Sequence, residues 1–408
     1  MFVRWLFLDM NSFFAAVEQQ EKRELRGKPV AVVPVMAETT SCIAASYEAR
    51  AFGVKTGTRV DEARRLCPNL HIIEADPNVY RRYSNAIRDV VDSCLPVTRV
   101  LSVDEMVCRL WENETDLAGA IELGRRIKEE IHWQVGASLN CSVGLGPNPL
   151  LAKVAAELIK PNGLSVLDKD DLPRKLFRME LTDWPGINTG MAVRFEKAGV
   201  HTTEQMYALS LDAMRRIFGG VEGERWWRRI RGEEVGTSPT KVGSINHSYV
   251  LPPELRTRRG SEMIAARLLE KAAERLRHSG YHASTLSIRL KSYEEGYWDR
   301  SARIPPCRET FTLMQAMRSL GEHPFREPRQ VSITLSGLIR DADVIPSLFD
   351  PPGAADVTDA VDSINRRYGR ATVCLGSVLN VREHAQDKIA FGRIADLAPI
   401  TSGQSRLL

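Results

Sequence analysis

The chain has 408 residues, of which 43% are hydrophobic and 26% charged, and these proportions indicate an ordinary globular protein of about two to four domains. They exclude a disordered tail, a collagen and a small disulfide scaffold. The apolar runs are too short to span a bilayer, and the first residues predict a buried strand rather than a signal peptide. The seven cysteines include no Cys-x-x-Cys pair, which indicates reduced thiols in a cytoplasmic protein without a structural zinc site.

The net charge of +4 is unevenly distributed along the chain. Residues 1–167 contain 20 basic and 21 acidic side chains, whereas residues 241–345 contain 17 basic and 12 acidic ones. A near-neutral first part and a basic later part suit an enzyme that holds a polyanion with its later domains. Ordinary scatter is the alternative, and the difference alone does not decide between them.

The first part of the chain alternates between strand and helix patterns. The apolar run Val3–Leu8 predicts a buried strand, and a helix begins in the FFAAVEQQ segment, for which Asn11 and Ser12 are capping residue types. Interleaved strands and helices predict an α/β domain. The further predicted elements are a strand at 29–34, the start of a helix at 46–50, a helix at 80–93, strands on both sides of Asp104 within 97–110, an amphipathic helix at 117–131, a strand at 139–143 and a helix from Asn148 to Ile159.

The second part of the chain has a different organisation. An all-helical stretch is predicted from Trp184 to about Arg231, and the polar segment from Gly232 to Ser244 is the best candidate for a linker. Strands at 244–251, 284–291 and 330–338, with a helix at 261–278, then predict a small α+β domain. The residues after Ile345 are polar and rich in proline and glycine, and we expect them to be partly extended.

Three carboxylates interrupt otherwise apolar runs in the first part. Asp9 ends the first predicted strand, and Asp104 and Glu105 lie side by side within a strand pattern. Strict pleating would direct Asp104 and Glu105 to opposite faces, but a hairpin turn or bulge near Val103 would let both converge. If the strands that carry Asp9 and Asp104 pair, three acids meet at one place; otherwise they are plain surface acids.

Such a cluster of acids repels itself unless divalent cations neutralise it. Ligands that are all oxygen favour magnesium over zinc. Two magnesium ions at such a site suit in-line phosphoryl or nucleotidyl transfer, because one activates the attacking oxygen and the other stabilises the triphosphate and its leaving group. If the three acids converge they predict a two-magnesium centre, and their spacing alone does not decide between this centre and plain surface acids.

Several cationic or hydrogen-bond-donating side chains could bind a phosphate ligand. Tyr47 and Arg50 lie three residues apart on one predicted helical face, and Lys160 ends a predicted helix. Each of these side chains could equally be a solvated surface group. The chain contains no Walker A, GxSxG, HExxH or GxGxxG motif, so a P-loop ATPase and the common hydrolase, zincin and dinucleotide-binding classes are disfavoured.

Together, a set of ordered segments resembles a known family. They are LDMNSFFAAVE, ELRGKPVAVV, SYEARAFGVKTG, LSVDE, SVGLGPNPLLAKVAAELIKPNG, WPGINTG, SINHSYVLP, AVDSINRRYG and IAFGRIADL. Their order and spacing resemble a Y-family DNA polymerase of the DinB (DNA polymerase IV) type over nearly the whole chain. The resemblance implies a multidomain α/β and α+β right-hand polymerase. Its expected parts are a palm (1–18 and 78–167), fingers (19–77), a helical, helix-hairpin-helix-like thumb (168–232), a linker (233–244), a little finger (245–345) and a C-terminal extension (346–408).

The resemblance also assigns roles to the residues singled out above. Asp9, Asp104 and Glu105 match the family's catalytic, metal-binding acids, and the carbonyl of Met10 is expected as a further ligand of the two Mg²⁺ ions. The nucleotide-binding positions match Phe13, Phe14, Tyr47, Arg50 and Lys160. Phe14 matches the steric gate, the aromatic residue that excludes a ribose 2′-hydroxyl, and Phe13 is interpreted as structural, with its backbone near phosphate.

The expected partners are primed template DNA and dNTPs. In the thumb, Gly186 begins a hairpin that would present backbone N–H groups to phosphates. Six arginines between Arg215 and Arg231 are expected to contact DNA, while Trp226 and Trp227 are expected to be core residues in part. The chain departs from the family pattern at Asn11, where Asp is usual, and at Asn188, where Gly is common. We expect activity to survive the first departure.

The family resemblance leaves further partners and rival functions to weigh. A sliding clamp is a possible partner through Ile345–Phe349, although this segment lacks the usual leading Gln. We expect a monomeric bacterial translesion polymerase without proofreading, since no stretch of the chain is left for an exonuclease. A catalytically inactive accessory protein of the ImuB kind is the nearest alternative, but it would lose the acids. A nucleotidyl cyclase is disfavoured because no GGDEF-like signature is present.

Overall fold

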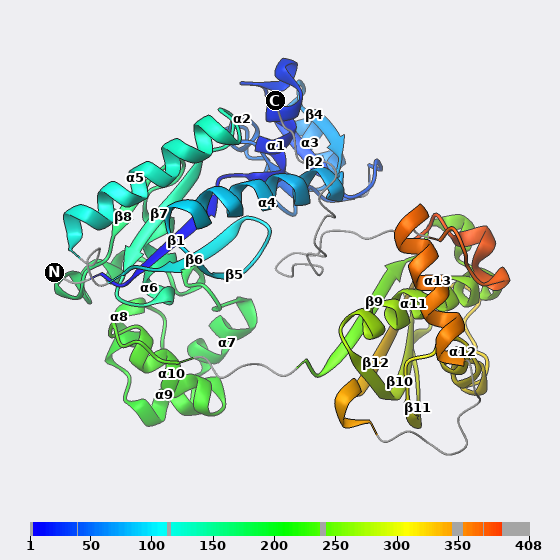
Figure 1. Ribbon diagram of the computed structural model, residues 1–408. Coiled ribbons are helices and arrows are strands. Elements are labelled where there is room, and N and C mark those ends of the chain that lie inside the picture. The colour runs from blue at the N-terminus through cyan, green and yellow to red at the C-terminus, as the bar shows by residue number, and fades with distance from the viewer. Residues whose placement is uncertain are drawn as a thin grey trace. The chain divides into compact units, whose positions relative to one another are not determined.

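The computed structural model describes residues 3–38, 40–111, 116–236, 242–344, 354–369 and 371–385. These residues form two compact units, one ending at Gly236 and one running from Val242 to Ala385 (Figure 1). Within the described residues, no helix is both long and apolar enough to cross a membrane. Each unit is built around a β-sheet of its own.

The first unit contains a five-stranded sheet in the order β5-β6-β1-β7-β8. Strand β1 lies at its centre, antiparallel to both β6 and β7, and all of its residues are buried. A central strand that is buried on both faces explains why this segment is apolar except for Asp9. The strands are β1 (Trp5–Met10), β5 (Val97–Val100), β6 (Glu105–Arg109), β7 (Cys141–Gly146) and β8 (Leu164–Val166).

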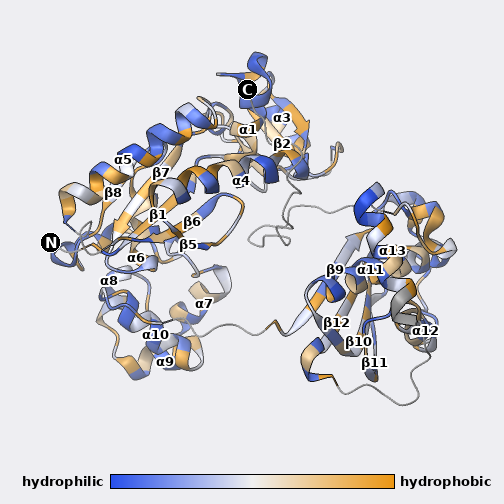
Figure 2. Ribbon diagram, viewed as in Figure 1, coloured by the Kyte–Doolittle hydropathy of each residue, from blue (hydrophilic) through white to orange (hydrophobic). Residues whose placement is uncertain are grey.

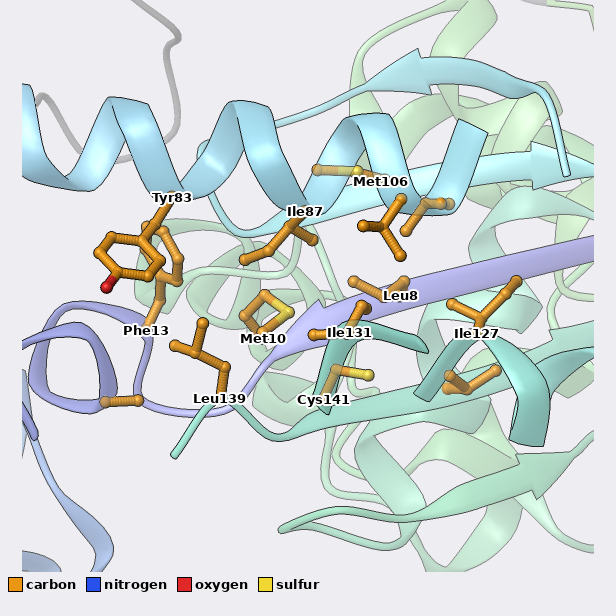
Figure 3. Close-up of a cluster of buried hydrophobic side chains, with 14 of the residues drawn as sticks. Leu8, Met10, Phe13, Tyr83, Ile87, Met106, Ile127, Ile131, Leu139 and Cys141 are labelled. Atoms are coloured by element: carbon orange, nitrogen blue, oxygen red, sulfur yellow. The ribbon is translucent and has the colours of Figure 1, made fainter. Parts of the chain in front are cut away.

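Helices cover both faces of this sheet. Helices α4 (Pro77–Cys94) and α5 (Leu117–Gln134) cover one face, where Ile87, Ile127 and Ile131 pack with Leu8, Met10, Met106 and Cys141 (Figure 3). The other face carries Trp5 and Phe7, which pack against α6 (Pro149–Leu158). Because side chains alternate along a strand, Asp9 lies on the same face of β1 as Trp5 and Phe7, the face that α6 covers.

A small subdomain follows the first helix. Its three-stranded sheet has the order β3-β2-β4, and its core contains Val33, Val54 and Val60. Helix α2 begins after Ser46, whose hydroxyl accepts a hydrogen bond from Ala49 N. The elements are α1 (Phe13–Glu21), β2 (Val30–Val33), β3 (Ala44–Ala45), α2 (Tyr47–Arg50), α3 (Val60–Leu66) and β4 (His71–Glu74).

The last part of the first unit is helical. Trp184, Phe195 and Trp226 form its core together with Leu151 and Val154 of α6, so α6 packs between the sheet and this helical part. Gly186 has a φ of 97°, a conformation that favours glycine, in the turn that precedes α7. The helices are α7 (Thr189–Lys197), α8 (Thr203–Ala208), α9 (Leu211–Phe218) and α10 (Val221–Arg229).

The second unit is a four-stranded antiparallel sheet in the order β11-β10-β12-β9, covered on one face by helices. Along β12, Val331, Ile333 and Leu335 are buried beneath α11, and they alternate with more exposed polar residues. The elements are β9 (Ser244–Val250), α11 (Arg258–His278), β10 (Tyr281–Ser292), β11 (Gly296–Cys307), α12 (Thr310–Ser319), β12 (Gln330–Arg340) and α13 (Ala354–Tyr368).

The expected mixed α/β multidomain fold is confirmed, and the structure corrects several local expectations. Residues 354–368 form the helix α13 instead of an extended segment, and Val378 and Val381 pack into the core of the second unit. The described residues 354–369 and 371–385 belong to the second compact unit. The expected boundary between little finger and C-terminal extension stays a prediction. Strand β11 and helix α12 were not predicted; β11 mixes charged, apolar and proline residues, so its hydropathy alternates poorly along the strand (Figure 2).

The helix cap near the first acid also differs from expectation. Ser12 occupies the N-cap position of α1 with a φ of 49°, in the left-handed region, and its side chain does not cap the helix. The linker expected at 233–244 spans the boundary between the two units, but residues 237–241 lie outside the described residues. The proposed clamp segment Ile345–Phe349 and the IAFGRIADL segment also lie outside them. The boundaries of palm, fingers and thumb stay predictions.

Candidate active site

Three acids lie where β1 ends and β6 begins. Asp9 lies directly opposite Glu105 in the antiparallel pair of β1 and β6, so both belong to one face of the sheet. Strands β5 and β6 form a hairpin, and Asp104 lies in its turn, where its carbonyl accepts a hydrogen bond from Met10 N at 2.9 Å. The hairpin near Val103 that the sequence suggested is therefore present, and it brings the acids together.

Asp9 is the most constrained of the three acids. Its residue is only 7% exposed, and its Oδ2 lies 2.9 Å from the Nζ of Lys160. Burial raises the pKa of Asp9 to about 7, and the Lys160 ammonium only partly offsets this effect. Lys160 also contacts Glu157 at 2.6 Å. Burial alone would lower the pKa of Lys160, but these two carboxylates raise it overall.

The other two acids also have short contacts. Burial raises the pKa of Asp104, and a hydrogen bond from the Ser102 hydroxyl partly counters that rise. Glu105 accepts a hydrogen bond from the Nζ of Lys153 at 2.6 Å, and this lysine projects from α6. Lys160, in contrast, lies beyond the end of α6, so no helical spacing relates the two lysines, and the contact between Lys153 and Glu105 across 48 positions left no local signal in the sequence.

A cavity of about 280 Å³ opens beside the acids. Its lining combines residues of the sheet, of the first helix and of the small subdomain. Every predicted site residue except Glu105 lines this cavity, and Glu105 points to Lys153 instead. The predicted residues that line it are Asp9, Met10, Phe13, Phe14, Tyr47, Arg50, Asp104 and Lys160.

The two phenylalanines at the start of α1 differ in their surroundings. Phe13 is 3% exposed and belongs to the main core, as expected for a structural residue. Phe14 is only partly buried, and its ring packs on that of Tyr80 with centroids 4.6 Å apart. Tyr80 projects from α4 and donates a hydrogen bond to Glu18 at 2.7 Å. Tyr80 was not predicted as a site residue, because it is one of several apolar-face residues on the long helix α4.

Tyr47 and Arg50 share one face of the short helix α2, as their spacing predicts. The guanidinium of Arg50 lies 4.8 Å from the centre of the Tyr47 ring, and its Nε donates to the carbonyl of Ala45 at 3.1 Å. These contacts fix the direction of the arginine across the cavity. Together with Lys160, the two side chains provide a hydroxyl and two cations on one side of the acids.

The two departures from the family pattern have structural roles. Asn11 is buried, and its Oδ1 accepts a hydrogen bond from Asn162 N at 2.7 Å. Asn188 is the N-cap of α7 and accepts from Met191 N at 2.9 Å. Among the described residues, neither side chain is hydrogen-bonded to Asp9, Asp104 or Glu105.

The donor set at the acids fits a hard divalent cation. All of the side-chain donors are carboxylate oxygens, and burial raises the pKa of both Asp9 and Asp104. Such carboxylates ionise more easily beside a cation. Among the described residues, no group of three His, Cys, Asp or Glu side chains has the geometry of a metal site. Lys153 and Lys160 neutralise two of the acids in this structure.

The second unit presents a polar surface on the face of its sheet opposite α11. On β10, Thr285, Ser287, Arg289 and Lys291 alternate with buried Leu286, Ile288 and Leu290. The residues in register with them on β11 and β12, and those on β9 that pair with β12, are also hydroxyl, amide or basic residues, apart from Val250 and Asp299. Asp299 is paired with Arg289. We call this the open face. The partners are Ser244, Asn246, Ser248, Val250, Tyr297, Asp299, Ser301, Arg303, Gln330, Ser332, Thr334 and Ser336.

The arginines of the helical part are largely engaged within it. Arg215 and Arg228 contact Glu224, and Arg229 contacts Glu222 at 2.8 Å. The guanidinium of Arg231 lies 3.8 Å from the Trp227 ring centre. A contact between these arginines and DNA stays a prediction, and it would require them to exchange partners. Trp226 is buried, as expected for a core residue.

Comparisons with known proteins agree with this arrangement. Residues 8–157 match the impB/mucB/samB family, and residues 243–348 match the impB/mucB/samB family C-terminal domain. The chain belongs to this family, the Y family of DNA polymerases. A Y-family DNA polymerase chimera, Dbh-Dpo4(243-245)-Dbh, has a similar fold with a TM-score of 0.70 at 21% identity, covering 83% of this chain and 99% of that one. The insertion ternary complex of Dbh DNA polymerase has a TM-score of 0.57.

Within the family, the chain is a homologue of DNA polymerase IV. It is 34% identical to the DNA polymerase IV of Moorella thermoacetica over 385 residues, which are 90% of this chain and 94% of that protein. It is 29% identical to that of Pelotomaculum thermopropionicum over 380 residues, covering 90% and 93%. These matches identify a DNA-directed DNA polymerase and confirm the family that the sequence segments resemble.

Proposed function

We propose that this protein is a template-directed polymerase for translesion synthesis, which adds dNTPs to a primer 3′ end at low fidelity and without proofreading. The observation that carries the proposal is the pairing of Asp9 with Glu105, with Asp104 in the adjoining turn, beside a cavity that also contains Tyr47 and Arg50. An inactive accessory protein would not need the three acids together with Tyr47 and Arg50.

Asp9, Asp104, Glu105 and the Met10 carbonyl would hold two magnesium ions. When bound, such ions activate the primer 3′-hydroxyl and neutralise charge on the triphosphate. The Ser102 hydroxyl orients Asp104 for this role.

The remaining lining residues would hold the nucleotide. The triphosphate oxygens accept hydrogen bonds from the Tyr47 hydroxyl and from the N–H groups of Arg50 and Lys160. Lys160 exchanges Asp9 for phosphate when the nucleotide enters, and its second carboxylate partner, Glu157, keeps it in place. Phe14, supported by Tyr80, borders the sugar and leaves no partner for a 2′-hydroxyl.

Primed DNA is the proposed partner of the second unit. The open face offers hydroxyls, amides and cations at the regular spacing of a sheet, and these groups suit phosphate and sugar contacts that do not depend on base sequence. Binding of a sliding clamp and a monomeric state stay predictions.

The test is primer extension with the purified protein, magnesium, dNTPs and a primed template. Asp104→Ala should reduce extension by roughly a hundred- to a thousandfold, as loss of one catalytic electrostatic group does, while DNA binding is kept. Asp89→Ala, which removes an exposed carboxylate on α4 that pairs with Arg88, is the matched control and should extend normally. Near-normal extension by Asp104→Ala would reject the site, and DNA binding without extension by the wild type would favour the accessory function.

A further inference from the structure

Lys128 on α5 has an unusual set of partners for a lysine. Its Nζ donates to three backbone carbonyls, those of Cys141 at 3.0 Å, Asn162 at 2.6 Å and Gly163 at 3.0 Å. Burial lowers the pKa of this lysine. An ammonium that is partly removed from water and bonded to three carbonyls ties together the segments to which they belong. Here those segments are the start of β7 and the loop 160–163.

The same loop is held from its other side by the segment that follows Asp9. The buried Asn11 accepts a hydrogen bond from Asn162 N at 2.7 Å, and its Nδ2 donates to the Ser142 hydroxyl at 3.1 Å. An aspartate at position 11 could accept from Asn162 but could not donate to Ser142 as the amide does. Asn11 therefore links β1, β7 and the loop through one side chain.

The loop has little room to change its path. A Cβ atom at Gly163 would lie 1.9 Å from the carbonyl oxygen of Ile159, so the chain passes too close to itself for any side chain at this position. At the start of the loop is Lys160, whose ammonium lies 2.9 Å from Asp9. The contacts of Lys128 and Asn11 thus fix the backbone from which Lys160 extends into the cavity.

We propose that Lys128 and Asn11 are positioning residues for Lys160, and that they set the affinity for the triphosphate of the incoming nucleotide. This inference rests on the proposed function, because it takes Lys160 as a triphosphate ligand. Neither residue need touch the nucleotide. Their effect is to hold the Lys160 ammonium within reach of a phosphate oxygen. Lys160 and its loop then lose little conformational entropy when the nucleotide binds.

The test is a double-mutant cycle on single-nucleotide insertion. Lys128→Met keeps the aliphatic stem and removes the donors, and we expect the KM for dNTP to rise roughly tenfold with a smaller change in kcat. In a Lys160→Ala background, the same substitution should change KM less than about twofold, because the residue it positions is gone. Arg125→Met, which removes an exposed charge from the same helix, should leave both constants unchanged.

Two further variants separate positioning from folding. Lys128→Arg restores donors for the carbonyls and should recover most of the KM, whereas a role in packing alone would not be rescued. If Lys128→Met does not fold, as judged by its melting curve, Asn11→Ala tests the same loop from the other side and should show the same non-additivity with Lys160→Ala. A wild type that inserts no nucleotide overturns the proposed function. A wild type that inserts normally while the effects of Lys128 and Lys160 simply add overturns this inference alone.

Discussion

Phe14 and Phe13 are neighbours in sequence with different surroundings, and this difference gives the sugar-gate hypothesis a matched control. Phe14→Ala should raise ribonucleotide insertion relative to deoxynucleotide insertion by about a hundredfold, because the ring that would oppose a 2′-hydroxyl is gone. The supporting Tyr80 ring stays in place, so the loss of stability should be small. Phe13→Ala should instead cost about 3–5 kcal/mol of stability, as expected for a buried phenylalanine, with unchanged sugar choice.

Single-nucleotide insertion of rNTP and dNTP, together with melting temperatures, checks this prediction. Unchanged sugar discrimination in Phe14→Ala, with a stability loss like that of Phe13→Ala, would assign Phe14 to the core instead.

The raised pKa of Asp9 predicts a pH-dependent demand for magnesium. Because the pKa lies at about 7 in the metal-free protein, a proton competes with the cation for this carboxylate below that pH. The Mg²⁺ concentration for half-maximal extension should fall roughly tenfold between pH 6 and pH 8. A magnesium requirement that is independent of pH would contradict a buried, protonated Asp9.

Stability should follow the same linkage with a defined sign. The folded-state pKa of Asp9 is above the unfolded value of 3.8, so its stabilising contribution is present at low pH and is lost as the pH rises through about 7. Asp9→Asn should therefore raise the melting temperature more at pH 8 than at pH 5.

At the scale of elements, the close approach of α6 to β7 positions Lys153, the partner of Glu105. A Cβ atom at Gly144 would lie 2.0 Å from the Ala152 carbonyl oxygen, so only glycine lets the helix lie this near the strand. Gly144→Ala should displace α6, cost about 3 kcal/mol of stability, and lower extension because Lys153 moves with the helix. Gly236→Ala, where a Cβ meets nothing within 4 Å, is the control. Urea denaturation measures the stability and primer extension the activity. Normal stability of Gly144→Ala would show that α6 can shift away from the added Cβ atom without cost, which would contradict the prediction.

The sequence predicted most elements of the first unit, and the reasons for its failures are physical. Strong periodicity identified α4 and α5, and proline and asparagine signals identified the start of α6. Strand β11 was missed because one of its faces is open to solvent and carries few apolar residues. Helix α13 was missed because its proline- and glycine-rich flanks suggested an extended chain.

The candidate site shows the same division. For Asp9, Asp104 and Glu105, the sequence pattern left open both a convergence at a hairpin and three surface acids, and the family resemblance assigned them to one site. The roles of Lys153, Lys128 and Tyr80 depend on contacts between residues distant in the chain, such as the 48 positions that separate Glu105 from Lys153. Such contacts depend on how the helices pack on the sheet, and no local sequence pattern predicts them.

At the scale of the whole molecule, the two units divide chemistry from DNA binding in the proposed function. Neutralisation of phosphates by the open face should make DNA affinity fall steeply with salt. Lys291→Ala and Arg303→Ala together should lower the slope of log affinity against log salt by about two, one for each lost phosphate contact. Arg318→Ala, on α12 at the opposite, helix-covered side of the sheet, should leave the slope unchanged. Fluorescence anisotropy with primed DNA measures the slopes, and equal slopes for all three proteins would exclude the open face.

The lysine–acid pairs beside the cavity also bear on how this site could be lost in evolution. Lys153 is only partly exposed and has Glu105 as its carboxylate partner, so a substitution of Glu105 alone leaves a partly buried cation without its counterion. Inactivation through this acid therefore carries a penalty in folding as well as in catalysis. We expect lineages that abandon polymerisation to replace Lys153 together with Glu105, so that a neutral residue at either position is accompanied by a compensating change at the other.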